Sequence, residues 1–426
     1  MKKKTFRSLG VIKPILDSLE KQNITTPTEI QAKTIPLILE GKDIIGGSKT
    51  GSGKTLAFSC GIIKKTTHRK GIQSLVLVPT RELAEQVGSA IRKFSKFEKM
   101  DTIKVYGGVS IDRQIRDLKS ADVVVATPGR LLDHINRNTI RLDRVRLLVL
   151  DEADMMLDMG FLRDVEKIIQ AIPKRRQTLL FSATVDGDIE HLEEKYMRNP
   201  VTVSVEQFVD SSKLSQRYMD VTSKEKFSLL VHLLKKEKSG LVMVFCNSRR
   251  NTDFVAKNLK ANGIQSVAIH GGLTQSKRKQ ILDDFHKGKT YALICTDVAA
   301  RGLDIKDVSH VYNYDVCKDA KQYIHRIGRT ARAGKDGRAV TLLSERDHEN
   351  FSKIMRVNED LEFEERPHFK QAEITFRPSS GSRGGRFSQS RGRSSAGRSN
   401  AQRPRSNRSN SDQPRRSNSN NRHQRR

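Results

Sequence analysis

Residues 147 to 154 read LLVLDEAD, and this stretch decides the fold. Four consecutive aliphatic residues are typical of a strand that is buried on both faces, as in the interior of a parallel sheet. Asp151 and Glu152 follow at once, where the strand ends. Ligands of open α/β sheets bind at the carboxyl ends of the strands, so this stretch predicts a functional site built around two carboxylates.

Similar short runs rich in Val, Ile and Leu occur on both sides of this stretch, separated by longer segments of helical period. After the first run, Leu83, Val87, Ile91 and Phe94 predict a helix with one apolar stripe facing the sheet. A second series of runs follows later in the chain, which indicates two α/β domains of similar design. The expected strands are 74–78, 122–126, 147–150 and 178–182, and then 241–246, 266–270, 291–295, 310–314 and 338–343.

The charge of the chain indicates a polyanionic partner. The 426 residues carry a net charge of +30. Residues 377–426 are rich in Arg, Ser, Asn, Gly and Gln, and their 14 Arg and one Asp supply +13 of that charge. Such a tail cannot build a core, so we expect it to be disordered. The remaining +17 makes the body basic too, which suits RNA, DNA or an anionic membrane surface.

Other features exclude several classes of protein. No stretch approaches the roughly 18 apolar residues of a membrane-spanning helix, and the basic start MKKKTFRSLG (1–10) has no apolar segment after it. We therefore expect a soluble, cytoplasmic protein without a membrane partner. The cysteines lack CxxC spacing, which indicates reduced core thiols rather than disulfides or zinc ligands. They are Cys60, Cys246, Cys295 and Cys317.

A glycine-rich run, GGSKTGSGKT at 46–55, precedes the acidic pair by about a hundred residues. Gly51 and Gly53 allow backbone N–H groups to turn toward phosphate oxygens. Lys54 can reach the β and γ phosphates, and Thr55 can ligate Mg²⁺ at the start of a helix. The run therefore predicts a phosphate-binding loop.

The loop departs from the strict pattern because Ser48 stands at a glycine position. The acids strengthen the prediction, since one of Asp151 and Glu152 can hold Mg²⁺ while the other orients the attacking water. A solvated acidic turn is the alternative, but such a turn rarely follows four buried aliphatic residues. Together the two motifs predict a nucleoside triphosphatase.

The second domain contributes HRIGRTAR at 325–332. Arg326, Arg329 and Arg332 recur every three residues, which predicts guanidinium groups along one side of a helical turn. Arginines placed in this way could reach a γ-phosphate across a cleft between the domains. A solvated basic face is the alternative interpretation.

Nine short motifs occur in a fixed order: TPTEIQ, SKTGSGKT, PTREL, TPGR, DEAD, SAT, HGG, TDVAARGLD and HRIGRTARAG. This set, which covers roughly residues 6 to 345, resembles the DEAD-box family of ATP-dependent RNA helicases. The short N-terminus and the basic tail are similar to bacterial RhlE-type members. The resemblance implies two tandem RecA-like domains with parallel sheets, a disordered basic C-terminal tail, and ATP and Mg²⁺ as cofactors.

The resemblance also implies roles for individual residues. Asp151 would hold the metal through water, and Glu152 would be the general base. Arg329 and Arg332 would act as arginine fingers, together with the catalytic Lys54. Ser182, Thr184 and His325 would couple the two domains and their ligands. The residues implied in nucleotide binding are Phe6, Gln31, Thr50, Gly51, Ser52, Gly53, Lys54, Thr55 and Asp304, and those implied in metal binding are Thr55 and Asp151.

For RNA, the family pattern implies contacts to the backbone rather than to the bases, and therefore binding that is independent of sequence. The partner would be single-stranded RNA or a short duplex, for example in ribosomal precursors or in complexes with the RNA decay machinery. The residues implied are Arg81, Gly108, Thr127, Arg130, Arg249, Gly271 and Thr296. Four residues depart from the family pattern: Ser48 stands where Ala is usual, Asn23 and Ile24 replace a common Gly-Phe, and Ala331 replaces a common Gly. Since Ser48 and Ala331 are small, we expect tuning rather than loss of activity.

We expect four segments: an ATP-binding domain (1–206), a linker (207–216), a helicase C-terminal domain (217–366) and an RNA-binding tail (367–426). The expected activity is local unwinding of short RNA duplexes and remodelling of RNA–protein complexes, driven by RNA-stimulated ATP hydrolysis and domain closure. Two alternatives remain open. One is a nucleic-acid chaperone whose tail does the essential work, and the other is a translocating DNA helicase.

Overall fold

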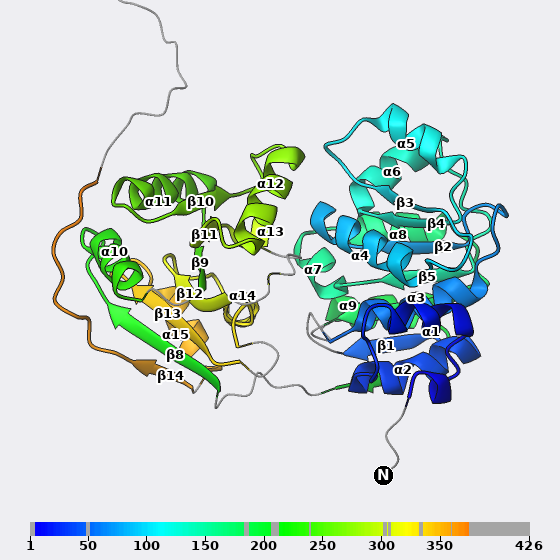
Figure 1. The fold of residues 1–426 in the computed structure, drawn as a ribbon, viewed down its shortest axis with the longest axis horizontal. Helices are drawn as coiled ribbons and strands as arrows, with labels where there is room; N and C mark the ends of the chain where they lie inside the picture. Colours follow the sequence, from blue (N-terminus) through cyan, green and yellow to red (C-terminus); the bar gives the residue numbers. More distant parts are fainter. Residues whose placement is uncertain are drawn as a thin grey trace, which may run out of the picture. The chain divides into compact units, whose positions relative to one another are not determined.

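The computed structural model describes residues 5–47, 52–182, 187–205, 213–237, 240–300, 305, 308–331, 335–358 and 360–374. These residues form two sheets of seven parallel strands each (Figure 1). We refer to each sheet with its helices as the first lobe and the second lobe. Both lobes belong to one compact unit. The expected α/β class with two parallel sheets is confirmed.

In the first lobe the strands lie in the order β3-β4-β2-β5-β6-β1-β7. The strands are β1 (Ile44–Gly47), β2 (Ser74–Leu77), β3 (Thr102–Val105), β4 (Val123–Ala126), β5 (Leu147–Leu150), β6 (Gln177–Ser182) and β7 (Val201–Ser204). The helices are η1 (Arg7–Leu9), α1 (Lys13–Glu20), α2 (Glu29–Glu40), α3 (Lys54–Lys65), α4 (Arg81–Phe94), α5 (Ile111–Leu118), α6 (Pro128–Asn136), α7 (Ala153–Asp158), α8 (Leu162–Gln170) and α9 (Gly187–Tyr196).

The second lobe repeats this topology, since its strands lie in the order β10-β11-β9-β12-β13-β8-β14 and each occupies the place of the strand seven numbers lower. The strands are β8 (Leu214–Asp220), β9 (Leu241–Phe245), β10 (Ser266–Ile269), β11 (Ala292–Cys295), β12 (Val308–Asn313), β13 (Gly337–Leu343) and β14 (Leu361–Phe363). The helices are α10 (Lys226–Lys236), α11 (Arg249–Ala261), α12 (Gln275–His286), α13 (Asp297–Ala300), α14 (Ala320–Ile327) and α15 (His348–Met355).

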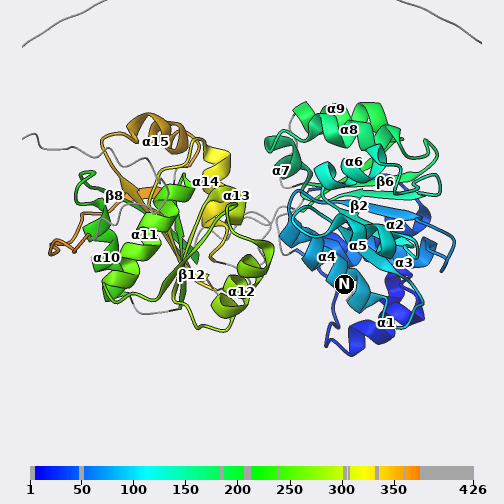
Figure 2. The ribbon, with the colours of Figure 1, turned by 90° about the horizontal axis from the view of Figure 1, so that it is seen from above.

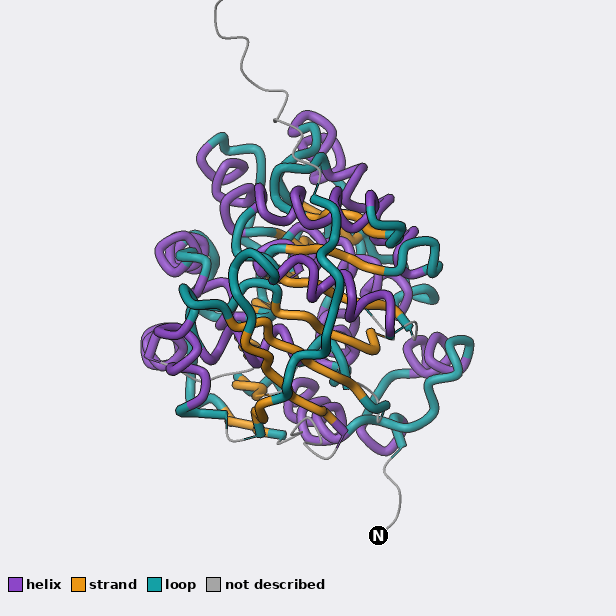
Figure 3. The backbone as a smooth tube through the Cα atoms, turned by 90° about the vertical axis from the view of Figure 1, so that its left-hand side faces the viewer, coloured by secondary structure: helices purple, strands orange, loops and turns teal. Residues whose placement is uncertain are grey.

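Strand β5 shows why the sheets are buried on both faces. Successive side chains of a strand point to opposite faces, so Leu147 and Val149 join one apolar cluster while Leu148 and Leu150 join the other. Helices α3 and α4 cover the first cluster, and α6 and α8 cover the second (Figure 2). In Figure 3 the strands accordingly lie between layers of helix. A run of four aliphatic residues is what this three-layer arrangement requires.

The helix predicted after the first apolar run is α4. Its stripe of Leu83, Val87, Ile91 and Phe94 is buried in the first-lobe core. Thr80 caps the helix, because its Oγ1 accepts a hydrogen bond from the backbone N–H of Leu83 at 3.3 Å. The predicted amphipathic helix is therefore confirmed.

All nine predicted strands are present, but several strands were not predicted. Strand β3 reads TIKV and has half-buried side chains at Ile103 and Lys104, so its apolar signal is weak. Strand β1 reads IIGG and leads directly into the glycine-rich loop, so it lacks an apolar run long enough to predict a strand. The edge strand β7 exposes alternate residues. Strands near a loop or at an edge lack the continuous apolar run on which the prediction depended.

Two expected boundaries need correction. Strand β8 begins at Leu214 and pairs with β13, so the last residues of the expected linker belong to the second sheet. Residues 367–374, which were expected in the tail, pack against the second lobe and run along the outside of α10 and α11 (Figure 1). The backbone N–H of Ala372 donates to Ser228 Oγ at 3.0 Å, and Phe369 is partly buried. The rest of the expected tail, from 375 on, lies outside the described residues.

The loops that follow β1 and β8 occupy equivalent places in the two lobes. Each leads to a helix whose first residue is a buried lysine, Lys54 in α3 and Lys226 in α10. In the second lobe, Lys226 Nζ lies 2.8 Å from the carboxylate of Asp347. The backbone N–H and the hydroxyl of Ser223 donate to the carboxylate of Glu345, at 3.2 and 2.8 Å. The second-lobe loop therefore binds acidic side chains of its own chain.

Two expectations about chemical class can be checked against the whole described fold. All four cysteines are buried and free, as expected for reduced core thiols. Within the described residues, none of the helices combines the length and apolar character needed to span a membrane.

Glycine at position 46 should be essential for the stability of the first lobe. A Cβ added to Gly46 would lie 2.4 Å from the ring of Phe181, which is fully buried in β6. We predict that Gly46→Ala lowers the free energy of unfolding by about 1–3 kcal/mol because the core is overpacked. The measurement is urea unfolding, with Gly187→Ala as control, since a Cβ there meets nothing within 4 Å. Equal stability of the two variants would contradict the packing argument.

Candidate active site

The parallel order of the first sheet brings the ends of several strands to one edge. Strands β4, β2, β5, β6 and β1 are neighbours in that order, so the turns after them lie side by side. This edge holds most of the first-lobe residues that the sequence singled out: Arg81, Thr127, Arg130, Asp151, Glu152, Ser182 and the glycine-rich loop.

The glycine-rich loop is braced by the start of α2. Gln31 Nε2 donates to the carbonyl of Gly53 at 3.0 Å, and Thr28 Oγ1 donates to the carbonyl of Ser52 at 2.8 Å. Gly53 has a φ of +94°, and a Cβ there would lie 2.2 Å from Gln31 Nε2, so only glycine fits. Thr50 and Gly51, two of the expected phosphate ligands, lie outside the described residues.

Lys54 lies at the centre of a buried group of charges. Its Nζ is 3.5 Å from Glu152 Oε1, and the two side chains are only 5% and 12% exposed. Burial lowers the pKa of Lys54, but the charges of Glu152, Asp151 and Asp154 outweigh it and hold the pKa above its ordinary value. Burial raises the pKa of Asp151 to about 7. The carboxylates thus outnumber the cation, which favours a further positive charge here.

Glu152 is held in an unusual backbone conformation. Its φ of +53° lies in the left-handed region, which side chains other than glycine rarely adopt. The backbone N–H of Glu152 donates to Asp151 Oδ1 at 3.1 Å, and α7 begins at the next residue. Strain of this kind, which costs on the order of 1 kcal/mol, tends to persist where function requires a fixed side chain.

The residues present fit a magnesium ion. Mg²⁺ prefers oxygen ligands and usually binds through one or two carboxylates together with phosphate oxygens and water. Asp151 offers a buried carboxylate whose raised pKa a cation would relieve. Thr55 offers a hydroxyl in the first turn of α3, beside Lys54. This donor set is hard and oxygen-rich, as the ion requires.

Phe6 and Gln31 were both expected to contact the nucleotide base. Phe6 is only 3% exposed and belongs to the first-lobe core, while Gln31 is 4% exposed and braces the loop. Gln31 also accepts a hydrogen bond from the backbone N–H of Thr28 at 2.9 Å and so helps to form the capping box of α2. Both side chains therefore have structural partners within the first lobe.

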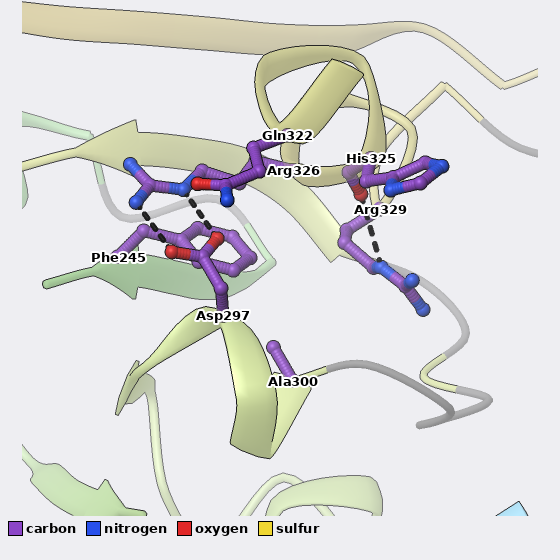
Figure 4. A pocket seen from close by; sticks show the side chains of 7 residues that line it. All are labelled: Phe245, Asp297, Ala300, Gln322, His325, Arg326 and Arg329. Atoms are coloured by element: carbon purple, nitrogen blue, oxygen red, sulfur yellow. Dashed lines mark hydrogen bonds and ion pairs between the residues drawn. The ribbon is translucent and has the colours of Figure 1, made fainter. Parts of the chain in front are cut away.

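The spacing of HRIGRTAR predicted arginines along one side of a helical turn. Helix α14 ends at Ile327, so of the two arginines that the structure describes here, Arg326 lies in the helix and Arg329 lies beyond its end. The guanidinium of Arg326 is 1% exposed and forms a bidentate pair with Asp297 at 2.6 and 2.7 Å (Figure 4). It also donates to Asn247 Oδ1 at 2.8 Å and to the backbone carbonyl of Asp315. Arg326 is therefore a buried connection between the residues that follow β9, β11 and β12, a role that the sequence did not reveal.

Arg329 and His325 line a small pocket next to this connection (Figure 4). Arg329 Nε donates to the carbonyl of His325 at 3.3 Å, and Arg329 lies two residues beyond the helix end. Three other expected site residues, Thr184, Asp304 and Arg332, lie outside the described residues.

The first-lobe residues expected to bind RNA lie together. Arg81 begins α4, and its guanidinium lies against Gly107 and Gly108, where an added Cβ would come within 3.2 and 2.3 Å of it. Arg130 donates to the carbonyl of Val109 at 3.1 Å, and Thr127 immediately precedes α6. The structure thus gathers the expected set on one surface.

The second lobe repeats this arrangement. Arg249 begins α11, and its guanidinium lies 3.3 Å from where a Cβ of Gly271 would be. Gly272 donates its backbone N–H to His270 Nδ1 at 3.1 Å, which fixes the turn. Thr296 follows β11 directly. Each lobe therefore presents an arginine at the start of a helix, resting on a pair of glycines that leave backbone groups accessible.

One polar pair was not anticipated from the sequence. Arg278 of α12 donates from Nε to Glu82 Oε1 at 2.7 Å, and both side chains are only 8% exposed. Glu82 follows Arg81 in the same turn, and Gln275 also donates to it at 3.4 Å. Glu82 lies in the PTREL motif, but nothing in that motif points to Arg278, so only the three-dimensional structure reveals the pair.

Two of the departures from the family pattern occupy left-handed backbone. Asn23 has a φ of +56° and Ala331 a φ of +52°. Asparagine tolerates this region, whereas alanine adopts it at a cost of roughly 1 kcal/mol. A glycine would be free of strain at either place, which explains why glycine is common there in the pattern.

Comparisons with known proteins agree with this geometry. Residues 28–192 match the model of the DEAD/DEAH box helicase family, and residues 225–334 match the helicase conserved C-terminal domain. The DEAD-box ATP-dependent RNA helicase CshA of Bacillus cereus is 45% identical over 356 residues, which cover 83% of this chain and 68% of the relative. CshA of Bacillus subtilis is 44% identical over 346 residues, covering 80% and 70%.

Solved structures give the same result. Dbp5 of S. cerevisiae bound to RNA and ADP BeF3 has a TM-score of 0.78 and 31% identity, covering 85% of this chain and 96% of that one. A DEAD box protein from Methanococcus jannaschii has a TM-score of 0.51 and 40% identity, covering 84% and 98%. With both lobes matched over most of their length, this chain belongs to the DEAD-box family of ATP-dependent RNA helicases.

Proposed function

We propose that the protein couples hydrolysis of ATP to the local separation of short RNA duplexes and to the remodelling of RNA–protein complexes. The observation that carries the proposal is the buried group of Lys54, Asp151 and Glu152 on the same sheet edge as Arg81 and Thr127. A phosphate site and a nucleic-acid surface that share one edge can influence each other through the turns between them.

For the nucleotide, Lys54 and the N–H groups at the start of α3 would bind the phosphates. Gln31 and Phe6 would select adenine. Thr55 and Asp151 would hold Mg²⁺, which when bound withdraws charge from the phosphate oxygens. Glu152 would accept a proton from the attacking water as the water oxygen bonds to the γ-phosphorus and the bond to ADP breaks. The fixed left-handed backbone of Glu152 supports this role, because it sets the direction of the carboxylate.

Residues of the second lobe would complete the site. Arg329, with Arg332 beyond the described residues, would stabilise charge on the transferred phosphoryl group, and Asp304 would contact the ribose. Ser182, Thr184 and His325 would link occupancy of the nucleotide site to that of the RNA site. The hydrogen bond from Arg329 to the carbonyl of His325 supports such a link, since it joins the finger to the helix that carries the coupling residue.

RNA would be held by its backbone. Arg81 and Arg249 offer guanidinium groups beside open glycine turns, which suits phosphates and 2′-hydroxyls and does not discriminate between bases. The remaining contacts would come from Gly108, Thr127, Arg130, Gly271 and Thr296. Binding would therefore be independent of sequence, with single-stranded RNA or a short duplex as substrate.

Closure of the two lobes would drive strand separation. ATP shifts the equilibrium between open and closed states only as far as it binds the closed state better than the open state. Arg329 would supply this difference in affinity by meeting the phosphate only on closure. Hydrolysis removes that difference and releases the RNA. The buried pair of Glu82 and Arg278 supports a closed arrangement, because it joins α4 to a second-lobe helix.

The basic composition of residues 377–426 is the feature that supports an RhlE-like subtype, whereas the relatives named above are CshA proteins. We also propose a cytoplasmic location, and ribosomal precursors or complexes of the RNA decay machinery as substrates. The basic charge of the chain supports an RNA partner in each case.

The first test is ATP hydrolysis by the purified chain alone, with single-stranded RNA, and with DNA of the same sequence. We expect RNA to raise turnover strongly and DNA to raise it little, because the backbone contacts include 2′-hydroxyls. High turnover without nucleic acid would contradict the coupling. Equal stimulation by DNA would favour a DNA helicase.

Glu152→Gln tests the catalytic role. We predict a fall of about 100-fold or more in ATP turnover, the usual contribution of a general base, with ATP binding retained because the two side chains have the same shape. Strand separation should stop. Turnover and nucleotide affinity are measured separately, and Glu349→Gln on the exposed surface of α15 is the control. If turnover persists, another group is the base. If annealing survives without turnover, the chaperone alternative gains support.

Deleting residues 377–426 tests the tail. This deletion keeps residues 367–374, which pack on the second lobe. We predict that the shortened chain binds RNA more weakly and with a shallower salt dependence. The slope of log K against log salt should fall by up to about 0.9 for each phosphate that the shortened chain no longer neutralises. ATP turnover at saturating single-stranded RNA should change by about twofold or less. A collapse of turnover under those conditions would place the tail in the catalytic cycle.

A further inference from the structure

The edge of the first sheet opposite the active site has a distinct character. In a parallel sheet all strands begin at the same edge, so the loops that enter them lie side by side. Residues 64–73, 141–146 and 173–176 lead into β2, β5 and β6, which are neighbours in the sheet, and the first of these segments begins with the last two residues of α3. We refer to these three segments as the basal loops.

The basal loops concentrate positive charge. They contain ten Lys and Arg and one acid, Asp143, a net charge of +9. Eight of the ten basic side chains are exposed, and Lys65 and Arg176 are half-buried. Three further acids lie nearby, the buried Asp43 and Asp122 and the half-buried Asp101, and they reduce the local charge only to +6. The basic residues are Lys64, Lys65, Arg69, Lys70, Arg141, Arg144, Arg146, Lys174, Arg175 and Arg176.

Hydrogen bonds hold the basal loops to one another. Arg144 Nη1 donates to the carbonyl of Lys70 at 3.1 Å, which joins the first two loops. The backbone N–H of Gln177, where β6 begins, donates to the carbonyl of Arg146 at 2.9 Å, which joins the second loop to the third. The charges therefore form one continuous surface rather than three separate loops.

A buried carboxylate fixes the shape of the first basal loop. Asp122 is fully buried and accepts hydrogen bonds from the backbone N–H of Arg69 at 2.7 Å and of Asp101 at 3.0 Å. His68 Nδ1 lies 2.9 Å from the same carboxylate. Arg69 has a left-handed φ of +58°, which these contacts maintain. The position of the basic side chains is thus set by the fold.

This surface is separate from the site described above. The phosphate loop, the acids and Arg81 follow the strands, whereas the basal loops precede them. Strands β5 and β6 have four and six residues, so at about 3.3 Å per residue the two edges are roughly 13–20 Å apart. Nothing in the proposed mechanism uses the basal loops.

The chemistry of the surface identifies the kind of partner. A row of guanidinium and ammonium groups binds phosphates, and it requires a polyanion. Binding of single strands relies on stacking of bases on aromatic side chains, but the basal loops contain no Phe, Tyr or Trp. Protein interfaces and membrane-surface helices need exposed apolar side chains, and among the described residues the exposed large apolar side chains lie elsewhere. A duplex, whose bases are stacked inside, fits these conditions.

We propose that the basal loops are a second RNA-binding surface, which holds double-helical RNA through its phosphates while the opposite edge acts on a single strand. The inference rests on the RNA substrate class of the proposed function. It adds a place where the enzyme retains the duplex portion of a structured RNA. The effect would be a raised local concentration of substrate without any new catalytic group.

The test compares two variants of the full chain that lose equal charge. The basal variant carries Lys70→Gln, Arg141→Gln, Lys174→Gln and Arg175→Gln. The control variant carries Lys235→Gln, Lys236→Gln, Lys287→Gln and Lys289→Gln, which are exposed residues of the second lobe. Binding of a blunt-ended RNA duplex and of single-stranded RNA is measured without nucleotide over a range of salt concentrations.

We expect the basal variant to bind the duplex at least about fivefold more weakly than the control at ~0.1 M salt. The slope of log K against log salt concentration should be shallower by up to about 0.9 for each phosphate left without a basic partner. Affinity for single-stranded RNA and ATP turnover at saturating single-stranded RNA should match the control. If both variants lose duplex affinity equally, or neither does, the proposal is wrong.

Two further outcomes would also overturn the proposal. If the basal variant loses as much affinity for single-stranded RNA as for the duplex, the surface extends the path of the single strand. If duplex binding is retained but binding to phosphatidylcholine vesicles that contain phosphatidylserine is lost, the partner is a membrane surface. ATP turnover that fails to respond to RNA even in the unmodified chain would instead refute the proposed function, so the two failures can be told apart.

Discussion

Everything described above depends on the hydrogen bonding of parallel strands. A parallel pair needs a crossover, usually through a helix, so each strand of a lobe starts at one edge of the sheet and ends at the other. The chain therefore passes through each of these two edges once for every strand. Lys54 and Glu152, which are far apart in the chain, therefore meet without any direct sequence relation. The same constraint separates the chemistry of one edge from the charge of the other.

Buried polar groups then fix the turns at both edges. Asp122 binds two backbone N–H groups beneath the basal loops, and Arg326 joins Asp297 and Asn247 at the ends of second-lobe strands. Each of these side chains is satisfied by several partners, as a buried charge must be. Loops that would otherwise be mobile become part of the rigid sheet, and the exposed residues beside them acquire defined positions.

The sequence predicted the elements that short-range patterns of residues determine. The LLVL run and the stripe of α4 specify buried elements by periodicity alone, and the acids after β5 follow from strand direction. Edge strands such as β3 escaped prediction because half of their side chains face water. The helix end at Ile327, which separates Arg326 from Arg329, coincides with Gly328, a stop signal that the spacing of the arginines alone does not include. Residues 367–374 read PHFKQAEI and show neither a helix nor a strand period, so their place on α10 and α11 follows only from tertiary contacts.

The duplicated topology has a consequence in the loop after β8. Lys226 stands where Lys54 stands in the first lobe, yet it already meets Asp347, and Ser223 already holds Glu345. The hydrogen bond from Ser223 keeps the pKa of Glu345 low, so its negative charge persists at neutral pH. A phosphate at the loop after β8 would meet these carboxylates, and like charges repel, so the duplicated fold disfavours a second phosphate site in this lobe.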